Sequence, residues 1–144
     1  MPRALDSLAA PLAVLNARRQ VIFANKAFQD FARGASMDEI CGSRPGDVLG
    51  CVNAHHGCGD WEGCGFCGAR QAIGETQKTG QPAARECHIT VDAPESPPAR
   101  DLLVRTTPFE IAGSDYVMVN FSDISDLKRR TALERIFFHD IQNT

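Results

Sequence analysis

Apolar and polar positions along the chain predict strands on both sides of a helical middle section. Residues 12–24 hold two short apolar runs that flank Asn16-Ala17-Arg18-Arg19, a pattern typical of a β-hairpin. Three later segments either alternate between apolar and polar residues or are rich in Val, Ile, Leu and Phe. These predicted strands are 84–92, 101–111 and 115–124, with a turn at 112–114 between the last two.

Helical patterns occupy the middle and the end of the chain. Apolar residues recur at helical spacing in 25–36, 37–42 has the composition of a short helical turn, and 68–81 is a longer helix that stops at Gly80. Pro45-Gly46 predicts a turn, and a charged helix is expected from Ser125. Helices placed between two groups of strands predict the α+β class with an antiparallel sheet, followed by a C-terminal helix.

Composition and charge restrict the class of protein. The chain has 144 residues, the length of one domain, and its 43% apolar and 23% charged residues are ordinary for a globular protein. A net charge of −3 gives no electrostatic reason to expect nucleic acid or a membrane surface as a partner. No apolar run approaches the ~20 residues of a membrane helix. The first residues do not resemble an export signal, so we expect Met1 to be the natural start and the location to be cytoplasmic.

Cysteine and glycine are concentrated in residues 50–69, which hold four of the six cysteines. In a reducing cytoplasm such cysteines favour metal binding or redox chemistry over structural disulfides. Cys64 and Cys67 form a Cys-x-x-Cys pair, and Cys51 and Cys58 upstream complete a set of four thiolates that suits tetrahedral Zn²⁺ or an iron–sulfur cluster. We expect these four cysteines to hold a metal centre in an ordered loop. Ligand type alone leaves iron–sulfur, zinc and a thiol/disulfide switch open.

The other cysteine and histidine residues have less specific surroundings. Cys41 follows a predicted helical turn and is expected to be a small core residue. Cys87 lies between two polar residues in a predicted strand, so alternation places it on the opposite face, where it either packs or acts as a further ligand. His55 and His56 could replace a thiolate, but surface positions are favoured. A zinc deaminase is not expected, because the chain lacks a His-x-Glu motif ahead of Pro-Cys-x-x-Cys.

Four segments, taken in order, resemble the PAS family of sensor domains. Residues 11–28 are similar to the opening PAS hairpin and the Asn that follows it, and 44–50 to a short helical turn of the family. The helix that ends at Gly80, with the strand after it, resembles the long PAS helix and its following strand. Residues 115–130 look like the last PAS strand and its Asp-Ile exit into a signalling helix. The resemblance covers roughly residues 5–127. It implies an antiparallel sheet with short helices on one face around a pocket, which often holds a small cofactor.

The last residues resemble the phosphoacceptor helix of sensor histidine kinases, in which a His is followed by an acidic residue and then by Asn. His139, Asp140 and Asn143 occupy these positions. A neutral imidazole can attack a phosphoryl group while the adjacent carboxylate orients it and accepts its proton. The resemblance therefore implies that His139 is the phosphoacceptor. The chain as given has no ATP-binding domain, so its own enzymatic activity is left open. The parent protein is expected to be a protein-histidine kinase.

Together these resemblances predict a sensory input module of a two-component histidine kinase, which would act on a response regulator. The sensor domain is expected to span 1–122, with a cysteine-rich loop at 50–69, and the helix 123–144 to lead into a truncated phosphoacceptor region. Cytosolic oxygen-sensing kinases that hold an iron–sulfur cluster through four PAS cysteines are similar in design, although theirs form two Cys-x-x-Cys pairs. An iron–sulfur centre that senses redox state or oxygen is therefore favoured. The alternative is a PAS dimerisation or interaction module with a structural zinc and no redox sensing.

The C-terminal helix also carries apolar residues at the 3-4 spacing of a coiled coil. One stripe, which includes two polar residues, is Ile124, Leu127, Thr131, Glu134 and Phe138; a second is Leu133, Ile136, Phe137 and Ile141. We expect a parallel homodimer through this helix, because these residues would otherwise form an exposed apolar patch. The alternative is a single amphipathic helix folded back onto its own sheet.

Overall fold

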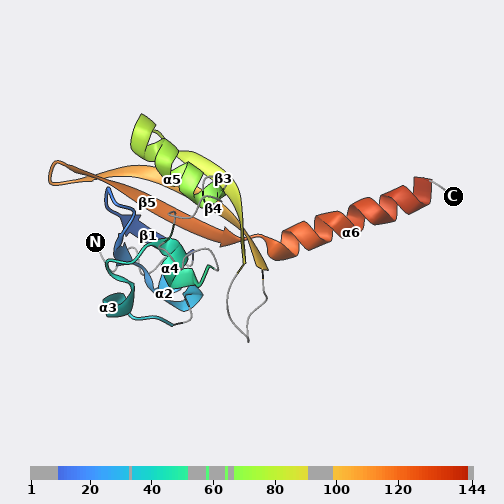
Figure 1. Ribbon diagram of the computed structural model, residues 1–144. Helices are drawn as coiled ribbons and strands as arrows, with labels where there is room; N and C mark the ends of the chain where they lie inside the picture. Colours follow the sequence, from blue (N-terminus) through green and yellow to red (C-terminus); the bar gives the residue numbers. More distant parts are fainter. Residues whose placement is uncertain are drawn as a thin grey trace.

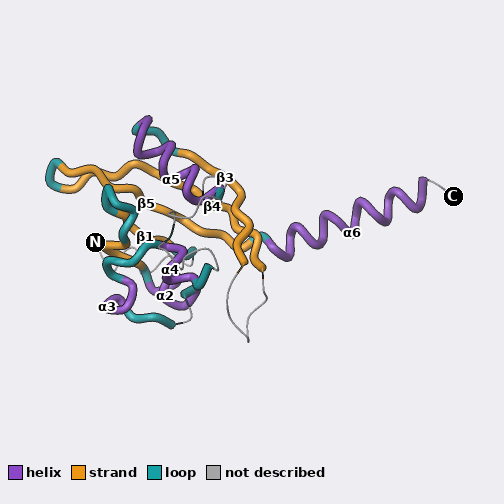
Figure 2. Tube along the Cα trace, viewed as in Figure 1, coloured by secondary structure: helices purple, strands orange, loops and turns teal. Residues whose placement is uncertain are grey.

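The computed structural model describes residues 10–32, 34–51, 58, 64, 67–90 and 99–142, without the side chains of 140 and 142. In these ranges the chain forms one antiparallel sheet, a group of short helices and a long C-terminal helix (Figure 1, Figure 2). The strands are β1 Leu12–Leu15, β2 Val21–Ala24, β3 Ala83–Thr90, β4 Ala99–Ile111 and β5 Ser114–Asp123. Their order in the sheet is β2-β1-β5-β4-β3, and all neighbouring strands are antiparallel. The predicted α+β class is confirmed.

Both predicted hairpins form. In the first, the Asn16 side-chain oxygen accepts the backbone N–H groups of Arg18 at 2.9 Å and Gln20 at 3.0 Å, which closes the turn between β1 and β2. In the second, β4 and β5 reverse over Ala112 and Gly113, whose φ angles are +50° and +82°. Positive φ at both central residues gives a two-residue turn a twist that matches the paired strands.

Five helices lie in the described ranges: α2 Lys26–Phe31, α3 Met37–Ile40, α4 Pro45–Leu49, α5 Gly68–Thr79 and α6 Ser125–Gln142. Helix α5 stops at Gly80, which has a left-handed φ of +69°, as the sequence predicts. The prediction of a turn at Pro45-Gly46 is wrong, because both residues lie in the first turn of α4. Proline is favoured there, since the first helical N–H groups have no partner within the helix.

Asn25 connects the opening hairpin to the first helix. Its side-chain oxygen accepts the N–H groups of Phe28 at 2.9 Å and Leu12 at 3.0 Å, and its amide nitrogen donates to the Ala10 carbonyl at 2.9 Å. Asn25 is fully buried, so these bonds compensate for the loss of water around the side chain. The residue caps α2 and holds it against the start of β1.

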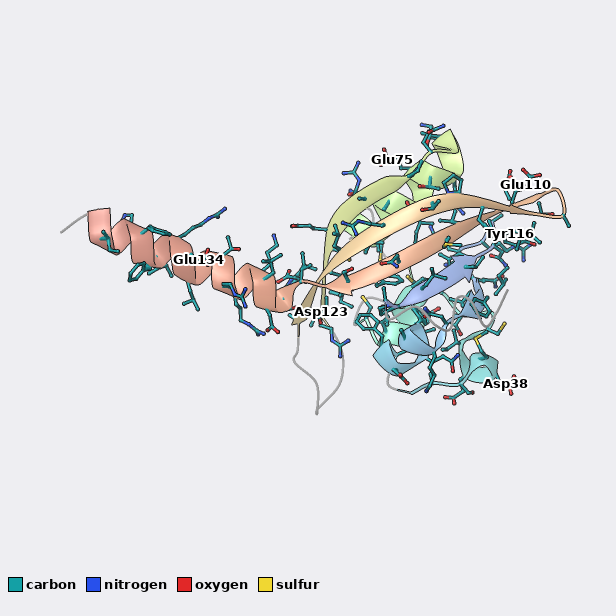
Figure 3. The ribbon with its side chains drawn as sticks, turned by 180° about the vertical axis from the view of Figure 1, so that it is seen from behind. Asp38, Glu75, Glu110, Tyr116, Asp123 and Glu134 are labelled. Atoms are coloured by element: carbon teal, nitrogen blue, oxygen red, sulfur yellow. The ribbon has the colours of Figure 1, made fainter. Side chains whose placement is uncertain are left out.

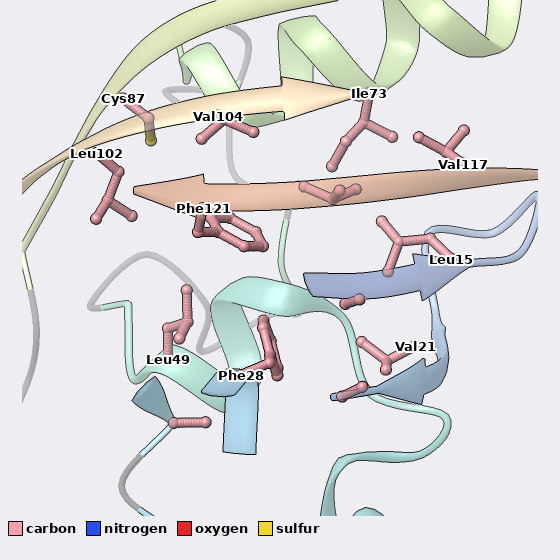
Figure 4. Packing of buried hydrophobic residues seen from close by; sticks show 14 of the residues in the cluster. Leu15, Val21, Phe28, Leu49, Ile73, Cys87, Leu102, Val104, Val117 and Phe121 are labelled. Atoms are coloured by element: carbon pink, nitrogen blue, oxygen red, sulfur yellow. The ribbon is translucent and has the colours of Figure 1, made fainter. Parts of the chain in front are cut away.

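The core fills the space between one face of the sheet and helices α2 to α5 (Figure 4). Alternate residues of β5, among them Val117, Val119 and Phe121, are buried, as are Val104 of β4 and Phe28 of α2. The Phe28 and Phe121 rings lie 5.7 Å apart between centroids. Strand alternation thus selects the inward face, and the helices cover it.

Helix α6 extends away from the sheet (Figure 1), with charged and apolar side chains along its length (Figure 3). Most of its apolar residues are exposed: Leu127, Leu133, Ile136, Phe137, Phe138 and Ile141. Folding of this helix back onto its own sheet, the alternative raised from the sequence, is therefore not what the structure has. No helix in the described ranges is long and apolar enough to cross a membrane. The domain division at 122/123 stays a prediction; β5 ends at Asp123.

Candidate functional site

A cavity of about 170 Å³ lies between α4, α5 and β3, and five of the six cysteines line it. They are Cys51, Cys58, Cys64, Cys67 and Cys87. The remaining wall is largely apolar and includes Leu49, Ile73, Leu102 and Phe121. The four cysteines expected to act together are therefore brought to one cavity, together with the cysteine of β3.

The α4 side of this cavity is organised around Cys58. The backbone N–H of Cys58 donates to the Asp47 carboxylate at 3.0 Å, and its carbonyl accepts from the Arg44 guanidinium at 2.9 Å. Its sulfur accepts the backbone N–H of Gly46 at 3.3 Å. A Cβ atom at Gly46 would lie 2.8 Å from that sulfur, so a larger residue would displace Cys58. Cys51 follows the C-cap residue of α4, Gly50, and its N–H donates to the Gly46 carbonyl at 2.9 Å.

Burial has the largest effect on the pKa of the Cys58 thiol. Loss of solvent raises the pKa of the Cys58 thiol to about 11. The N–H of Gly46 opposes this increase, while the charges of Asp47, Cys67 and Cys51 add to it. In the absence of a positive ion, Cys58 therefore remains a neutral thiol at neutral pH.

The α5 side of the cavity is organised around the Cys-x-x-Cys pair. The N–H of Cys67 donates to the Cys64 carbonyl at 3.0 Å, which forms a tight turn, and Cys67 is the N-cap of α5. Gly68 follows, and it lies against the backbone of β3. A Cβ atom at Gly68 would be 1.9 Å from the Glu86 carbonyl oxygen, so only glycine allows α5 to begin this close to the strand.

Cys67 and Cys87 form a close thiol pair across this contact. Their sulfur atoms are 3.6 Å apart, although the residues are 20 positions apart in the sequence. Cys87 is 3% exposed, and its side chain points from β3 toward the core (Figure 4), while its neighbours Glu86 and His88 are exposed. Alternation predicts Cys87 on the face opposite Glu86 and His88, and in the structure this face is the inward one.

The two sulfurs share one proton unequally. The hydrogen bond with Cys87 lowers the pKa of the Cys67 thiol to about 6, against the effect of burial. The backbone N–H groups and the Arg70 charge at the start of α5 lower this pKa further. The same hydrogen bond, together with burial, raises the pKa of Cys87 well above its ordinary value. Cys67 is therefore the thiolate and Cys87 the donor.

The cavity fits a thiophilic metal by the chemistry of its donors, since it presents five soft sulfur ligands. Sulfurs that share a tetrahedral zinc at ~2.3 Å lie about 3.8 Å apart. The Cys67–Cys87 distance of 3.6 Å is close to this value. In the part of the chain that the structure describes, however, no three Cys, His, Asp or Glu side chains are grouped as a complete ligand set. The identity of the metal and its full ligand set stay predictions.

The sequence-based expectation for Cys41 is wrong. Cys41 is exposed at the C-cap of α3, and its sulfur lies 3.7 Å from the Ile22 carbonyl oxygen, outside the cysteine-lined cavity. The buried residue of that turn is Ile40, because α3 turns this side chain toward the core. His55 and His56 lie outside the described residues.

The expected phosphoacceptor region lies on the outer part of α6. His139 is an exposed residue of this helix. The Asp140 side chain and Asn143 are outside the described part of the chain. The role of this group in phosphoryl transfer therefore stays a prediction.

The outer face of β3 connects the cavity to the base of α6. Glu86, next to Cys87, pairs with Lys128 of α6 at 2.6 Å. On the other side of Cys87, the His88 ring nitrogen lies 2.9 Å from the Asp101 carboxylate. The backbone of Asp101 accepts the Ile124 N–H at 2.8 Å and donates to the Ser125 hydroxyl at 3.0 Å. Sequence spacing does not reveal these contacts, because they join three separate elements.

A wider hollow of about 660 Å³ lies at the other end of the sheet, between the tip of the β4–β5 hairpin and the end of α5. Its polar lining includes Asn16, Gln77, Glu110, Asp115 and Tyr116. Among the described residues that line it, there is no cysteine or histidine. The smaller cavity therefore carries the reactive side chains.

Comparison with known proteins identifies the fold. No protein-family model matches the sequence, and no curated protein matches it. The PAS domain of BvgS from Bordetella pertussis is similar at a TM-score of 0.56 and 14% identity, over 100% of this chain and 96% of that one. The PAS domain of nitrogen regulation protein NR(II) from Vibrio parahaemolyticus is similar at a TM-score of 0.62 and 14% identity, over 85% of this chain and 96% of that one.

A PAS domain from a two-component sensor histidine kinase is also similar, at a TM-score of 0.58 and 11% identity, over 84% of this chain and 90% of that one. At such identities the likeness establishes the fold alone. The chain has a PAS fold, as its sequence motifs predict.

Proposed function

We propose that this chain is the sensory input module of a two-component histidine kinase and that its cysteine-lined cavity holds a metal centre. The convergence of Cys51, Cys58, Cys64, Cys67 and Cys87 on one cavity, from segments separated in the sequence, carries this proposal. An apolar wall and several thiols are the surroundings that a thiophilic metal requires. The similar PAS domain of a two-component sensor histidine kinase supports the kinase context.

The residues assigned to the centre are Cys51, Cys58, Cys64 and Cys67, with Cys87 as a further ligand. An iron–sulfur cluster held there would supply redox and oxygen reactivity, whereas zinc would supply only a fixed cross-link. Cys51 follows the end of α4, Cys67 caps the start of α5 and Cys87 lies in β3, so occupation of the cavity would tie these elements together. Loss of the metal would free α4, α5 and β3 to move apart.

The signal would then reach α6 through the outer face of β3. Glu86 and His88 flank Cys87, and their contacts lead to Lys128 and, through Asp101, to the first residues of α6. A shift of β3 at Cys87 would change these contacts. We propose that the resulting change in α6 controls phosphorylation of His139 in the full kinase, from which the phosphoryl group passes to a response regulator.

Purification without oxygen tests the proposed centre. We expect iron and acid-labile sulfide in stoichiometric amounts and a visible absorbance that is lost in air. Stoichiometric zinc without colour would contradict the redox function. In the full-length kinase, autophosphorylation should depend on oxygen, and His139→Gln should abolish it.

A second candidate function is a PAS dimerisation module with structural zinc. The exposed apolar residues of α6 favour this candidate, because such a helix surface pairs readily with a second copy. Here oxygen or a chelator would change stability but leave kinase output unaltered at a given protein concentration. The redox proposal requires that oxygen or a chelator changes the kinase output while the protein remains folded.

A further inference from the structure

We propose that Cys67 and Cys87 close into a disulfide when the cavity holds no metal and a hydroperoxide is present. Cys67 belongs to the four-cysteine set of the loop, whereas Cys87 lies in β3, so the pair joins the start of α5 to that strand. The inference rests on the proposed sensory function only for its effect on α6. The disulfide itself rests on the geometry of the two side chains.

The sulfur–sulfur distance of 3.6 Å is the first observation. A disulfide bond is about 2.0 Å long, so the sulfurs must approach by about 1.6 Å, a movement within reach of side-chain rotation. Cys67 is half-buried and Cys87 is buried, and both line the same cavity. A small oxidant that enters this cavity therefore meets both sulfurs.

The close packing of α5 on β3 is the second, independent observation. Gly68 lets the first turn of α5 lie directly on the strand backbone, since a Cβ atom there would be 1.9 Å from the Glu86 carbonyl oxygen and 3.4 Å from the Cys87 Cα. The residue before Gly68 is Cys67, so this contact places the two cysteines opposite each other. Packing of the α5 backbone on the β3 backbone therefore determines the positions of Cys67 and Cys87.

The chemistry balances with a hydroperoxide as oxidant. The Cys67 thiolate attacks the peroxide oxygen that carries the hydrogen, the O–O bond breaks, and Cys67 becomes a sulfenic acid. The other oxygen leaves as an alkoxide or hydroxide and takes a proton from solvent to give an alcohol or water. Cys87 then attacks the Cys67 sulfur, the S–O bond breaks, and the hydroxide leaves with the Cys87 proton as water. Two thiols are oxidised by two electrons, and the hydroperoxide is reduced.

The disulfide would covalently connect α5 to the strand whose outer face contacts α6. Glu86 and His88 lie on either side of Cys87, so closing of the pair would act on the same contacts that the proposed metal centre uses. Oxidation after loss of the metal would then lock the domain in a second state.

The test uses the whole chain, made metal-free with a chelator under reducing conditions and then treated with hydrogen peroxide after the reductant is removed. We expect a loss of two of the six thiols and a cross-linked peptide that joins Cys67 to Cys87. Cys41→Ser, which alters an exposed cysteine outside the cavity, should still lose two thiols. Cys87→Ser should lose the cross-link and leave Cys67 as a sulfenic acid that dimedone traps.

A cross-link from Cys67 to Cys64 or another cysteine, or a Cys87 that remains open to alkylation after oxidation, would overturn the inference. Since Cys87→Ser alters a buried position, the cross-link map of the unaltered chain decides the question by itself. Metal content, measured separately on protein purified without oxygen, keeps the two proposals distinguishable. A Cys67–Cys87 disulfide in a protein that binds no metal would leave this inference intact and contradict the proposed centre.

Discussion

Cys58, Cys67 and Cys87 differ in acidity because their neighbours differ. Burial keeps Cys58 protonated, whereas Cys67 receives a hydrogen bond from Cys87 and lies at the N-terminal end of α5. A thiolate is both the metal ligand and the nucleophile, so of these three cysteines Cys67 is ready for either role at neutral pH.

This difference predicts the pH dependence of alkylation. In metal-free reduced protein, the Cys67 alkylation rate should rise through a midpoint near 6, since the hydrogen bond from Cys87 lowers the pKa of Cys67 from 9.0 to about 6. Cys87→Ala removes the donor, so the midpoint should move up toward 9.0. Peptide-resolved labelling with iodoacetamide across pH measures both. The same midpoint in the Cys87→Ala and unaltered chains would contradict the assigned donor, and Cys41→Ala is the matched control.

Single cysteine-to-serine substitutions should distinguish the cysteines that bind the metal from those that do not. Cys64→Ser and Cys67→Ser should each abolish metal binding, because this pair forms the shortest chelate. Cys41→Ser should retain the full metal content and change the free energy of unfolding by less than about 0.5 kcal/mol, since Cys41 is exposed. Elemental analysis and urea unfolding give the two readouts. Loss of metal in Cys41→Ser but not in Cys51→Ser would show that the ligand set is wrong.

At the scale of helices and strands, the close contact between α5 and β3 determines the geometry of the cysteine-lined cavity. Two glycines of α5 have opposite surroundings: Gly68 lies against the β3 backbone, whereas a Cβ atom at Gly74 would have no neighbour within 4 Å. The same substitution should therefore have opposite effects at the two positions.

Gly68→Ala should destabilise the fold by about 1–3 kcal/mol, because the helix must move off the strand. The move also separates Cys67 from Cys87, so the peroxide-induced cross-link should be lost. Gly74→Ala should instead stabilise the chain by roughly 0.5–1 kcal/mol and retain the cross-link, since alanine is the better helix former. Urea unfolding and peptide mapping measure both effects. A Gly68→Ala chain as stable as the unaltered one would refute the close approach.

The whole molecule consists of a packed domain and a helix that leaves it. The apolar side chains of α6 stay exposed in the single chain, Phe137 at 60% and Ile136 at 59%. A soluble domain rarely exposes such a patch unless it is an interface. A parallel pair of α6 helices would cover the patch.

We therefore expect a homodimer at micromolar concentration. Ile136→Asp combined with Phe137→Asp should give a monomer with unchanged domain stability, because both side chains are exposed in the single chain. Arg130→Gln, an exposed change on the same helix, should remain dimeric. Sedimentation analysis distinguishes these states. A dimer that persists in the Asp variant would place the interface on the sheet domain, and a monomeric unaltered chain would exclude dimerisation through α6.

The sequence by itself determined the strands, most helix ends and, within an alternating strand, which side chains share a face. These features depend on local physics: alternation fixes which side chains share a face, and Gly80 ends α5 because it accepts a left-handed φ of +69°. The same reasoning placed Cys87 opposite Glu86 and His88, and the structure showed that this face is the inward one. The clustering of four cysteines in the loop also identified the candidate site.

Only the tertiary structure decided which surfaces meet. Cys41 was expected in the core but is exposed, because the docking of α3 selects Ile40 as the buried residue. The 3.6 Å contact between Cys67 and Cys87 depends on the approach of α5 to β3 that Gly68 allows. Local patterns give the orientation of each side chain within its own element, whereas a contact between elements depends on how their backbones pack.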